Sequence, residues 1–297
     1  MEAACGAALQ LSTLITGSQP NVALEPLNQR GRKEYMTRRG DFRLKSVCTR
    51  QRRFAFGLLS HSCNHSHVLE SENSYASFDE DWLLKNKAQE VTSYLNGRSI
   101  FLVGMMGSGK TTVGRILSEA LGYSFTDSDR SVELAMGGTS VSQIFEQCGE
   151  GFFRDHESEA LRILSLVPRQ IVSTGGGAVV RPINWKYMRQ GITVFLDVPL
   201  DALARRIAAV GTDSRPLLNF DAGDAYTKAF VGLFTLTKKR SEAYADADVT
   251  VSLLDIATNL RLEDVSDITP TVIAIEVLTQ IEKFLGGKSG GALRLYP

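Results

Sequence analysis

Gly104-Met105-Met106-Gly107-Ser108-Gly109-Lys110-Thr111-Thr112 is the stretch that decides the fold of this chain. It follows the apolar run 99–103 and precedes the helical pattern 113–121, so it stands between an expected strand and an expected helix. The spacing G-x-x-x-x-G-K-[ST] in this setting is typical of a phosphate-binding loop. The alternative is a glycine-rich turn that binds nothing, and the two flanking elements argue against it.

The physical chemistry of this loop favours a nucleotide. Gly107 and Gly109 permit backbone conformations that residues with a Cβ atom avoid, so successive N–H groups can turn towards an anion. The following helix presents its positive end to the same anion. Lys110 would add a charge near the β- and γ-phosphates, and Thr111 a hydroxyl for Mg²⁺. The residues expected to contact ATP here are Gly104, Met106, Gly107, Ser108, Gly109, Lys110, Thr111 and Thr112.

Composition and charge exclude several classes of protein. The 297 residues are 43% hydrophobic, and no apolar run approaches the ~20 residues that span a bilayer, so no membrane segment is expected. The formal net charge of zero argues against a nucleic-acid binder. The charge is uneven, however, because residues 1–60 hold ten Lys and Arg against four Asp and Glu.

Residues 1–60 have the composition of an organelle transit peptide, since they contain many Arg and Ser, few acids and no long apolar core. A retained basic tail or an arm that binds a polyanion are the alternatives, and composition alone separates chloroplast from mitochondrion poorly. We expect a linker or approach helix over 61–97, one folded domain over 98–285 and a flexible tail over 286–297.

Cysteine and histidine are sparse in the expected domain. Cys148 is its single cysteine, which excludes a disulfide framework and a cysteine-based metal site there. His61, His65 and His67 lie in a Ser- and Asn-rich linker that offers no fixed metal geometry. His156 is the one histidine beyond that linker, and this argues against a Ser-His-Asp mechanism.

Short apolar runs alternate with amphipathic patterns from Arg98 onward, which indicates an α/β domain with a parallel sheet. The expected strands are 99–103, 123–126, 170–174, 192–197 and 248–252. The expected helices are 110–121, 130–136, 140–147, 151–166, 182–189, 200–210, 225–245 and 270–285. Ligands of such sheets gather at the carboxyl ends of the strands, so the residues that follow each strand form the candidate site.

Asp127-Ser128-Asp129 follows the second expected strand. Residues i and i+2 of an extended segment point the same way, so Asp127 and Asp129 can share one site if a cation or a donor-rich ligand is present. Mg²⁺ beside ATP would supply the cation, with Thr111 as a co-ligand, and the other carboxylate could take the proton of an attacking hydroxyl. An Asx turn followed by a helix cap fits the same residues equally well.

Two further motifs can meet this pair. Gly175-Gly176-Gly177 follows the third expected strand and permits close approach of the backbone to a ligand. Arg154 and Glu157 are spaced i, i+3 on a helix that begins near Gly151, so Glu157 can orient the Arg154 guanidinium towards a carboxylate or phosphate. The alternative for this pair is a solvated surface contact worth ~0.3–0.5 kcal/mol.

The segment between the expected helices 200–210 and 225–245 contains Gly, Asp and Pro and is long enough for a mobile lid, about 211–224. Arg215 within it could swing over the γ-phosphate and stabilise the transition state. Arg240, at the end of Lys238-Lys239-Arg240, could serve a second anionic group. A solvated face is the alternative for this basic triplet.

Five of these motifs together resemble the shikimate kinase family, most closely its plant plastid form, over roughly residues 95–285. They are Gly104–Thr112, Asp127–Asp129, Gly149–Glu157, Gly175–Ala178 and Ser214–Leu218. The resemblance implies a nucleoside-monophosphate-kinase-like P-loop fold of three layers: a five-stranded parallel sheet with helices on both faces, a substrate-binding region and a mobile lid. It implies a phosphotransferase of the chloroplast stroma that converts shikimate to shikimate 3-phosphate with Mg²⁺ and ATP, on the route to chorismate and aromatic amino acids.

The resemblance also assigns roles on the acceptor side. Asp129 binds the ring hydroxyls of shikimate and deprotonates the one that attacks. Arg154 and Arg240 hold the carboxylate, and Glu157 orients Arg154. The backbone of Gly175, Gly176 and Gly177 closes around the ring.

On the nucleotide side, the resemblance implies that Lys110 and Arg215 stabilise the transferring phosphoryl group. Thr111 binds Mg²⁺ directly and Asp127 through water, while Arg206 lies against the adenine. The segment 254–269 is longer than in compact bacterial members, so their adenine contacts cannot be transferred to it. Ser128 stands where the family often has Thr or Cys, and we expect it to point away from the site.

Two other functions stay open from the sequence. One is a related kinase that acts on gluconate or a nucleoside monophosphate. The other is a plastid relative that has lost catalysis and binds a partner, although Lys110, Asp129, Arg154 and Arg215 are intact. We expect shikimate and ATP as the small-molecule partners and neither nucleic acid nor membrane, and the sequence does not fix the oligomeric state.

Overall fold

The computed structural model describes residues 69–211 and 224–289, with side chains for 79–211 and 224–287. Its five parallel strands form one sheet in the order β2-β3-β1-β4-β5. The strands are β1 Ile100–Val103, β2 Ser124–Asp127, β3 Gln170–Ser173, β4 Ile192–Asp197 and β5 Val249–Ser252. The expected five-stranded parallel sheet is therefore confirmed.

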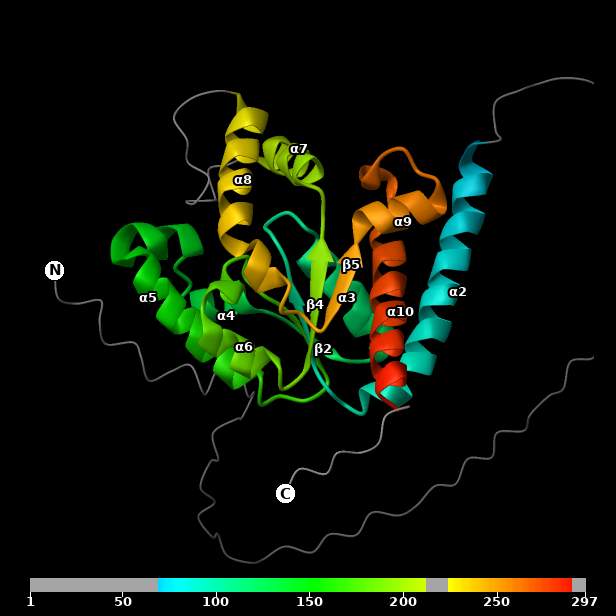
Figure 1. Ribbon diagram of the computed structural model, residues 1–297, viewed down its shortest axis with the longest axis horizontal. Coiled ribbons are helices and arrows are strands. Elements are labelled where there is room, and N and C mark those ends of the chain that lie inside the picture. The colour runs from blue at the N-terminus through cyan, green and yellow to red at the C-terminus, as the bar shows by residue number, and fades with distance from the viewer. Residues whose placement is uncertain (1–68, 212–223, 290–297) are drawn as a thin grey trace, which may run out of the picture.

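Helices cover both faces of this sheet (Figure 1). The helices are α2 Leu69–Leu95, α3 Lys110–Leu121, α4 Ser128–Ala135, α5 Val141–Leu164, η1 Ala178–Val180, α6 Pro182–Met188, α7 Leu200–Val210, α8 Ala225–Tyr244, α9 Leu253–Leu260, η3 Val265–Asp267 and α10 Pro270–Ser289. α2, α3 and α10 pack together on one side, and α4, α5 and α6 form a second group. The sequence predicts most of these elements to within two residues.

The position of each strand in the sheet follows from its residues. Every residue of β1 and β3 is buried, as expected for strands covered on both faces. β1 is apolar throughout, whereas β3 also buries Gln170 and Ser173 at its two ends. Ile100 of β1 pairs with Ile171 of β3 and Ile192 of β4. β2 and β5 lie at the two edges, and both expose part of their residues.

α5 joins the two helices expected over 140–147 and 151–166 into one element with a kink. Ser140 and Gln143 form a capping box that starts the helix. Gly149 interrupts the helical backbone with φ 82° and ψ 166°. The second half, which carries Arg154 and Glu157, therefore runs in a direction of its own.

The apolar residues of the described chain form two separate clusters. The larger cluster lies between the sheet and its helices. A smaller cluster, which we call the α4–α5 cluster, consists of Val132, Ala135, Ile144, Phe153, Ala160 and Ile163. Because Asp129 lies on α4 and Arg154 on α5, the α4–α5 cluster supports the candidate acceptor site separately from the sheet.

Three features go beyond the sequence prediction. α2 buries Leu84, Ala88, Val91 and Leu95 in the larger cluster and contacts α10 and α3. α9 lies within the long segment after β5, where Ser252 caps its first turn by accepting a hydrogen bond from the Asp255 N–H. α10 continues to Ser289, four residues beyond the expected end at 285. Among the described residues, no helix has the length and apolar character needed to cross a bilayer.

Candidate active site

The phosphate-binding loop has the geometry that its sequence predicts. Gly107 and Gly109 adopt φ of 81° and 90°, in the region that favours glycine, and α3 begins directly after Gly109. Lys110 is buried, and its Nζ donates hydrogen bonds to the carbonyls of Gly104 at 2.9 Å and Met105 at 2.8 Å. Burial lowers the pKa of Lys110 to about 8, against the opposite effect of Asp129 and Asp127.

Thr111 and Asp127 place two side-chain oxygens side by side at the start of α3. Thr111 Oγ1 donates to Asp127 Oδ2 at 3.1 Å and lies 3.2 Å from Ser173 Oγ. Asp127 Oδ1 accepts from the backbone N–H of Asp129 at 3.1 Å and of Arg130 at 3.3 Å. The helix-cap interpretation of this motif is therefore confirmed, because Asp127 caps α4. Asp127 also faces the start of α3, and its metal role stays a prediction.

Asp129 reaches the site by a different route from the one expected. The sequence argument places Asp127 and Asp129 on one extended segment, and this is wrong because Asp129 lies in the first turn of α4. Its Oδ1 is buried with no hydrogen-bond partner among the described residues. Burial, and then the carboxylates of Glu157 and Asp127, raise the pKa of Asp129 to about 7, while Lys110 and Arg154 oppose the shift. A carboxylate of this kind can accept a proton near neutral pH.

We expected Ser128 to point away from the site, and this is wrong. It is fully buried, and its Oγ accepts a hydrogen bond from the Gly175 N–H at 3.0 Å. The start of α4 therefore holds the glycine loop 175–177 by a side chain. No signal along the chain marks this contact, because Ser128 and Gly175 are 47 residues apart.

The glycine loop needs its glycines because two charged groups lie against it. A Cβ atom on Gly175 would overlap Asp129 Oδ1 and come within 2.7 Å of Glu157 Oε1. A Cβ atom on Gly177 would overlap the guanidinium of Arg154. The loop, the two carboxylates and the arginine thus meet at one place.

Arg154 and Glu157 form a buried ion pair. Arg154 Nη1 donates to Glu157 Oε2 at 2.8 Å, and the exposed fractions of the two side chains are 7% and 0%. The surface alternative for this pair is therefore wrong. Glu157 Oε1 has no partner among the described residues, like Asp129 Oδ1.

Glu150 is a contact that sequence reasoning missed. Its Oε1 accepts from Nε and Nη2 of Arg154 at 3.2 and 3.0 Å, and the Glu150 side chain is 51% exposed. The i, i+4 spacing of Glu150 and Arg154 was a readable signal. The kink at Gly149 hid it, because the spacing applies only if the helix resumes by residue 150.

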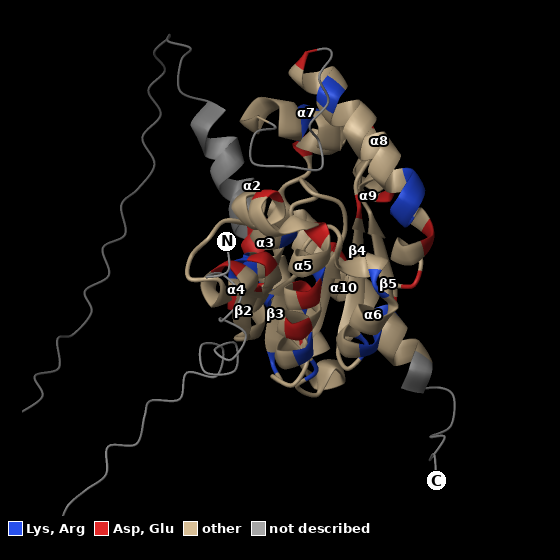
Figure 2. Ribbon diagram, turned by 90° about the vertical axis from the view of Figure 1, so that its left-hand side faces the viewer, with Lys and Arg blue, Asp and Glu red and all other residues tan. Residues whose placement is uncertain are grey.

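Arg240 of α8 also contacts the glycine loop. It is 4% exposed, and its Nη1 donates to the Gly176 carbonyl at 2.9 Å. No carboxylate among the described side chains lies within ion-pair distance of Arg240, so the structure leaves a buried positive charge facing the loop. Lys238 and Lys239 of the basic triplet are exposed, as the solvated alternative predicts for them. Figure 2 shows this basic band on α8.

The remaining candidates lie on the nucleotide side. Arg206 of α7 donates from Nη1 to the Gly107 carbonyl at 3.3 Å, which places it against the phosphate loop. Ser108 is buried, and Thr112 and Thr111 are exposed at the start of α3. Arg215 and most of the expected lid fall in 212–223, outside the described residues. His61, His65 and His67 also lie outside the described residues, before residue 69.

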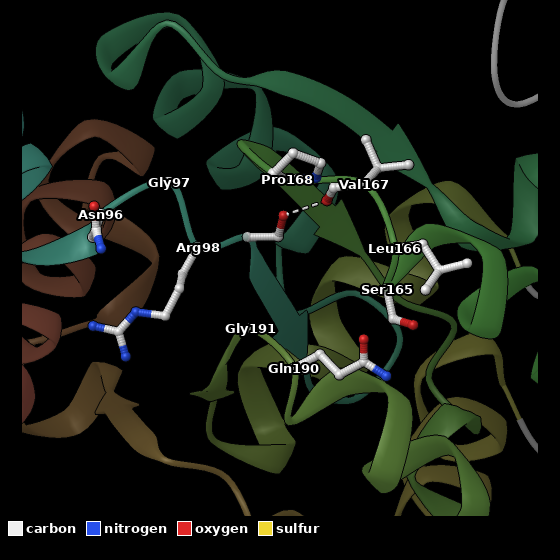
Figure 3. A pocket seen from close by; sticks show the side chains of 10 residues that line it. Asn96, Gly97, Arg98, Ser165, Leu166, Val167, Pro168, Gln190 and Gly191 are labelled. Carbon is white, nitrogen blue, oxygen red and sulfur yellow. Dashed lines mark hydrogen bonds between the residues drawn. The ribbon is translucent and has the colours of Figure 1, made fainter. Parts of the chain in front are cut away.

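A separate cavity of about 230 Å³ lies at the opposite end of the sheet. It is lined by the segments that precede β1, β3 and β4, among them Gly97, Pro168 and Gly191 (Figure 3). No candidate site residue lines it. The chemistry is therefore concentrated at the carboxyl ends of the strands, as the sheet topology predicts.

Comparisons with known proteins agree with one another. The family model described as "Shikimate kinase" matches residues 106–275. "Shikimate kinase 1, chloroplastic" of Arabidopsis thaliana is 57% identical over 235 residues, which are 79% of this chain and 77% of that protein. "Shikimate kinase 1, chloroplastic" of Oryza sativa subsp. japonica is 61% identical over 214 residues, which are 72% of this chain and 70% of that protein.

A solved structure supports the same likeness. The shikimate kinase of Acinetobacter baumannii in complex with shikimate superposes with a TM-score of 0.53 at 30% identity. The match covers 67% of this chain and 98% of that one. The likeness over 235 residues, 79% of this chain, extends well beyond the five motifs.

Proposed function

The chain belongs to the shikimate kinase family, and from that premise we propose how its residues perform the ATP-dependent phosphorylation of shikimate. ATP is the co-substrate, and the reaction belongs to the shikimate pathway. The plant relatives are named chloroplastic, and the chain acts in the chloroplast. We propose residues 1–60 as the transit peptide, 98–285 as the kinase domain and 211–224 as its lid.

Asp129 is the base in this proposal, and one observation carries it. Its Oδ1 is buried, has no partner among the described residues, and lies against the glycine loop beside Arg154 and Glu157. An acceptor hydroxyl placed there would donate its proton to Asp129 as its oxygen attacks the γ-phosphorus. The new P–O bond forms as the bond from the γ-phosphorus to ADP breaks, and Asp129 leaves the reaction protonated.

Arg240 supports an anionic acceptor. A buried guanidinium without a carboxylate partner is costly, and the carboxylate of shikimate would neutralise it. Arg154 would bind the same carboxylate while Glu157 holds its Nη1 edge. The backbone of residues 175–177 would close on the ring between these groups.

Lys110 and Arg215 would stabilise the charge on the transferring phosphoryl group. Thr111 and Asp127 fit Mg²⁺, because they offer a hydroxyl and a carboxylate oxygen that lie side by side and share a hydrogen bond. The Asp127 carboxylate would lie near the phosphates of ATP, and a cation between these negative charges would stabilise both. When bound, Mg²⁺ neutralises phosphate charge. Arg206, which already contacts the phosphate loop, would extend to the adenine.

The experiment that tests this function follows ADP release by the protein with Mg-ATP and one acceptor at a time. The acceptors are shikimate, gluconate, a nucleoside monophosphate and water. Turnover with shikimate alone supports the proposal. Turnover with another acceptor would contradict the roles given to Arg154 and Arg240, and binding of both substrates without turnover would point to the non-catalytic alternative.

A further inference from the structure

Tyr244, the last residue of α8, contacts both the phosphate-binding loop and the glycine loop 175–177. Its hydroxyl donates to the Gly176 carbonyl at 2.8 Å and lies 3.3 Å from Met105 Sδ. The ring is 2% exposed and stacks on Phe195 of β4, with centroids 4.7 Å apart and planes 7° from parallel. A tyrosine at the end of a helix could fill this space with its ring alone, so the two hydroxyl contacts need an explanation of their own.

The Gly176 carbonyl is the point where these contacts meet. It accepts from Tyr244 and also from Arg240 Nη1 at 2.9 Å, so both of its lone pairs are used. Arg240 and Tyr244 are spaced i, i+4 and lie on the same face of α8. The peptide that presents Arg240 to the acceptor is therefore held by Tyr244 as well.

The same peptide rests on the phosphate loop. A Cβ atom on Gly176 would lie 3.3 Å from the Met106 nitrogen, so the two loops are in backbone contact. The Met105 carbonyl accepts from Lys110 Nζ at 2.8 Å. Tyr244 thus contacts Met105, whose carbonyl accepts from Lys110. It also contacts the Gly176 carbonyl, which accepts from Arg240.

We propose that Tyr244 is a positioning residue, whose hydroxyl fixes the Gly176 peptide and thereby aligns Arg240 with the phosphate loop. The inference rests on the proposed function, because it assigns Arg240 to the carboxylate of the acceptor. Burial raises the pKa of Tyr244 to about 12, so the hydroxyl keeps its proton and remains a donor throughout the working range of pH. No other described residue bridges the two loops through a side-chain hydroxyl in this way.

Tyr244→Phe tests the proposal, since it removes the hydroxyl and keeps the stacked ring. Loss of one hydrogen bond of about 1 kcal/mol corresponds to a rise of about fivefold in the KM for shikimate. The KM for ATP and kcat should stay within about twofold, because the ring still packs on Phe195. Tyr226→Phe is the matched control, since Tyr226 is also on α8 and donates to Asp201 at 2.6 Å without touching either loop. It should leave the KM for shikimate unchanged.

Two outcomes would overturn the proposal. One is an unchanged KM for shikimate in Tyr244→Phe. The other is a parallel change in both KM values and kcat together with a lowered Tm, which a purely structural role would give. The wild-type protein is assayed first, so a failure of the proposed function appears as absent turnover with shikimate before any variant is compared.

A double variant gives a second, independent measurement. Tyr244 and Arg240 act on one carbonyl, so Tyr244→Phe should raise the KM for shikimate less in an Arg240→Lys background than in the wild type. Effects that simply multiply would mean that the two residues act separately, and the proposal would be wrong.

Discussion

Arg154 and Arg205 make the same contacts in two different environments. Each arginine binds a carboxylate four residues earlier in its helix, Glu150 for Arg154 and Asp201 for Arg205. Each also binds a second carboxylate, at 2.8 Å to Glu157 and at 2.6 Å to Asp264. The exposed fraction of the arginine side chain, however, is 7% at Arg154 and 47% at Arg205.

The difference teaches that burial, and not the number or length of ion pairs, separates the arginine that we propose for the acceptor site from a surface arginine. The Arg205 contacts are solvated and contribute little to stability. Loss of Arg154 would leave Glu157 charged and without water, which is costly. The shorter pair is the less consequential one here, so distance alone would rank them wrongly.

The largest expected effect in the buried region is that of Asp129→Asn. The amide cannot accept the proton of the attacking hydroxyl, so kcat should fall by ~10²–10⁴-fold, while ATP still binds. Single-turnover kinetics with Mg-ATP and shikimate, alongside nucleotide titration, measures both. A variant that kept wild-type turnover would remove Asp129 from the mechanism.

Arg154→Ala comes next. The contacts that Arg154 would make to an anionic acceptor are charge-assisted and worth ~1.5–3 kcal/mol. In the variant, the KM for shikimate should therefore rise by about one to two orders of magnitude, while the KM for ATP changes much less. The protein should also lose ~3–5 kcal/mol of stability, because Glu157 stays buried without its partner.

A second variant separates these two consequences. Arg154→Met combined with Glu157→Gln removes both charges, so denaturant unfolding should show most of the stability restored while the KM for shikimate stays high. Equal changes in both KM values, or no recovery of stability, would show that Arg154 acts through packing instead.

The pH dependence of the two regions should have opposite signs. Asp129 has a pKa raised to about 7 in the folded protein, so kcat/KM for shikimate should fall as pH drops below about 7. The raised value also means that Asp129 favours the folded state most below its unfolded pKa, about 3.9, and that this contribution is lost as pH rises through 7. At pH 8, the free energy of unfolding of Asp129→Asn should therefore exceed that of the wild type by up to about 4 kcal/mol, since one pKa unit corresponds to about 1.36 kcal/mol. Denaturant unfolding measures this difference.

Asp264 gives the matching contrast in the exposed region. The Ser266 backbone N–H, and then Arg205, lower its pKa to about 2. Asp264 therefore favours the folded state above its unfolded pKa, and this contribution is lost as pH falls towards 2. Denaturant curves of Asp264→Asn and Asp129→Asn across pH should diverge from the wild type at opposite ends of the range. Curves that diverged at the same end would contradict the assignment.

Arg205→Gln should have the smallest effect. Its ion pairs with Asp201 and Asp264 are exposed, so the steady-state constants should stay within about twofold and the Tm should barely move. A thermal melt and a full kinetic profile of this variant complete the comparison. A loss as large as that of Arg154→Ala would show that burial is not the distinguishing property.

Sequence reasoning succeeded where a residue's role depends on neighbours in the chain. Gly107 and Gly109 follow a local pattern and adopt the positive φ that it predicts. Lys110 begins α3, where the expected helix starts. Arg154 and Glu157 share a face by helical spacing alone. The five strands follow from short apolar runs between amphipathic patterns.

It failed where a role depends on contacts between distant segments. Ser128 bonds to Gly175 and Tyr244 to Gly176 across the fold, and neither spacing is visible along the chain. Glu150 depended on how the helix resumes after Gly149. α9 is eight residues long, too short for a clear period, and depends on burial of Leu253 and Ile256 against the larger cluster.

The α4–α5 cluster has an evolutionary consequence. Because its six buried residues are separate from those under the sheet, substitutions among them can reshape the acceptor region without repacking the phosphate loop. The recognition of the alcohol and the handling of the nucleotide can therefore diverge at different rates. We therefore expect substitutions in the α4–α5 cluster to alter the acceptor region while the packing under the sheet is kept.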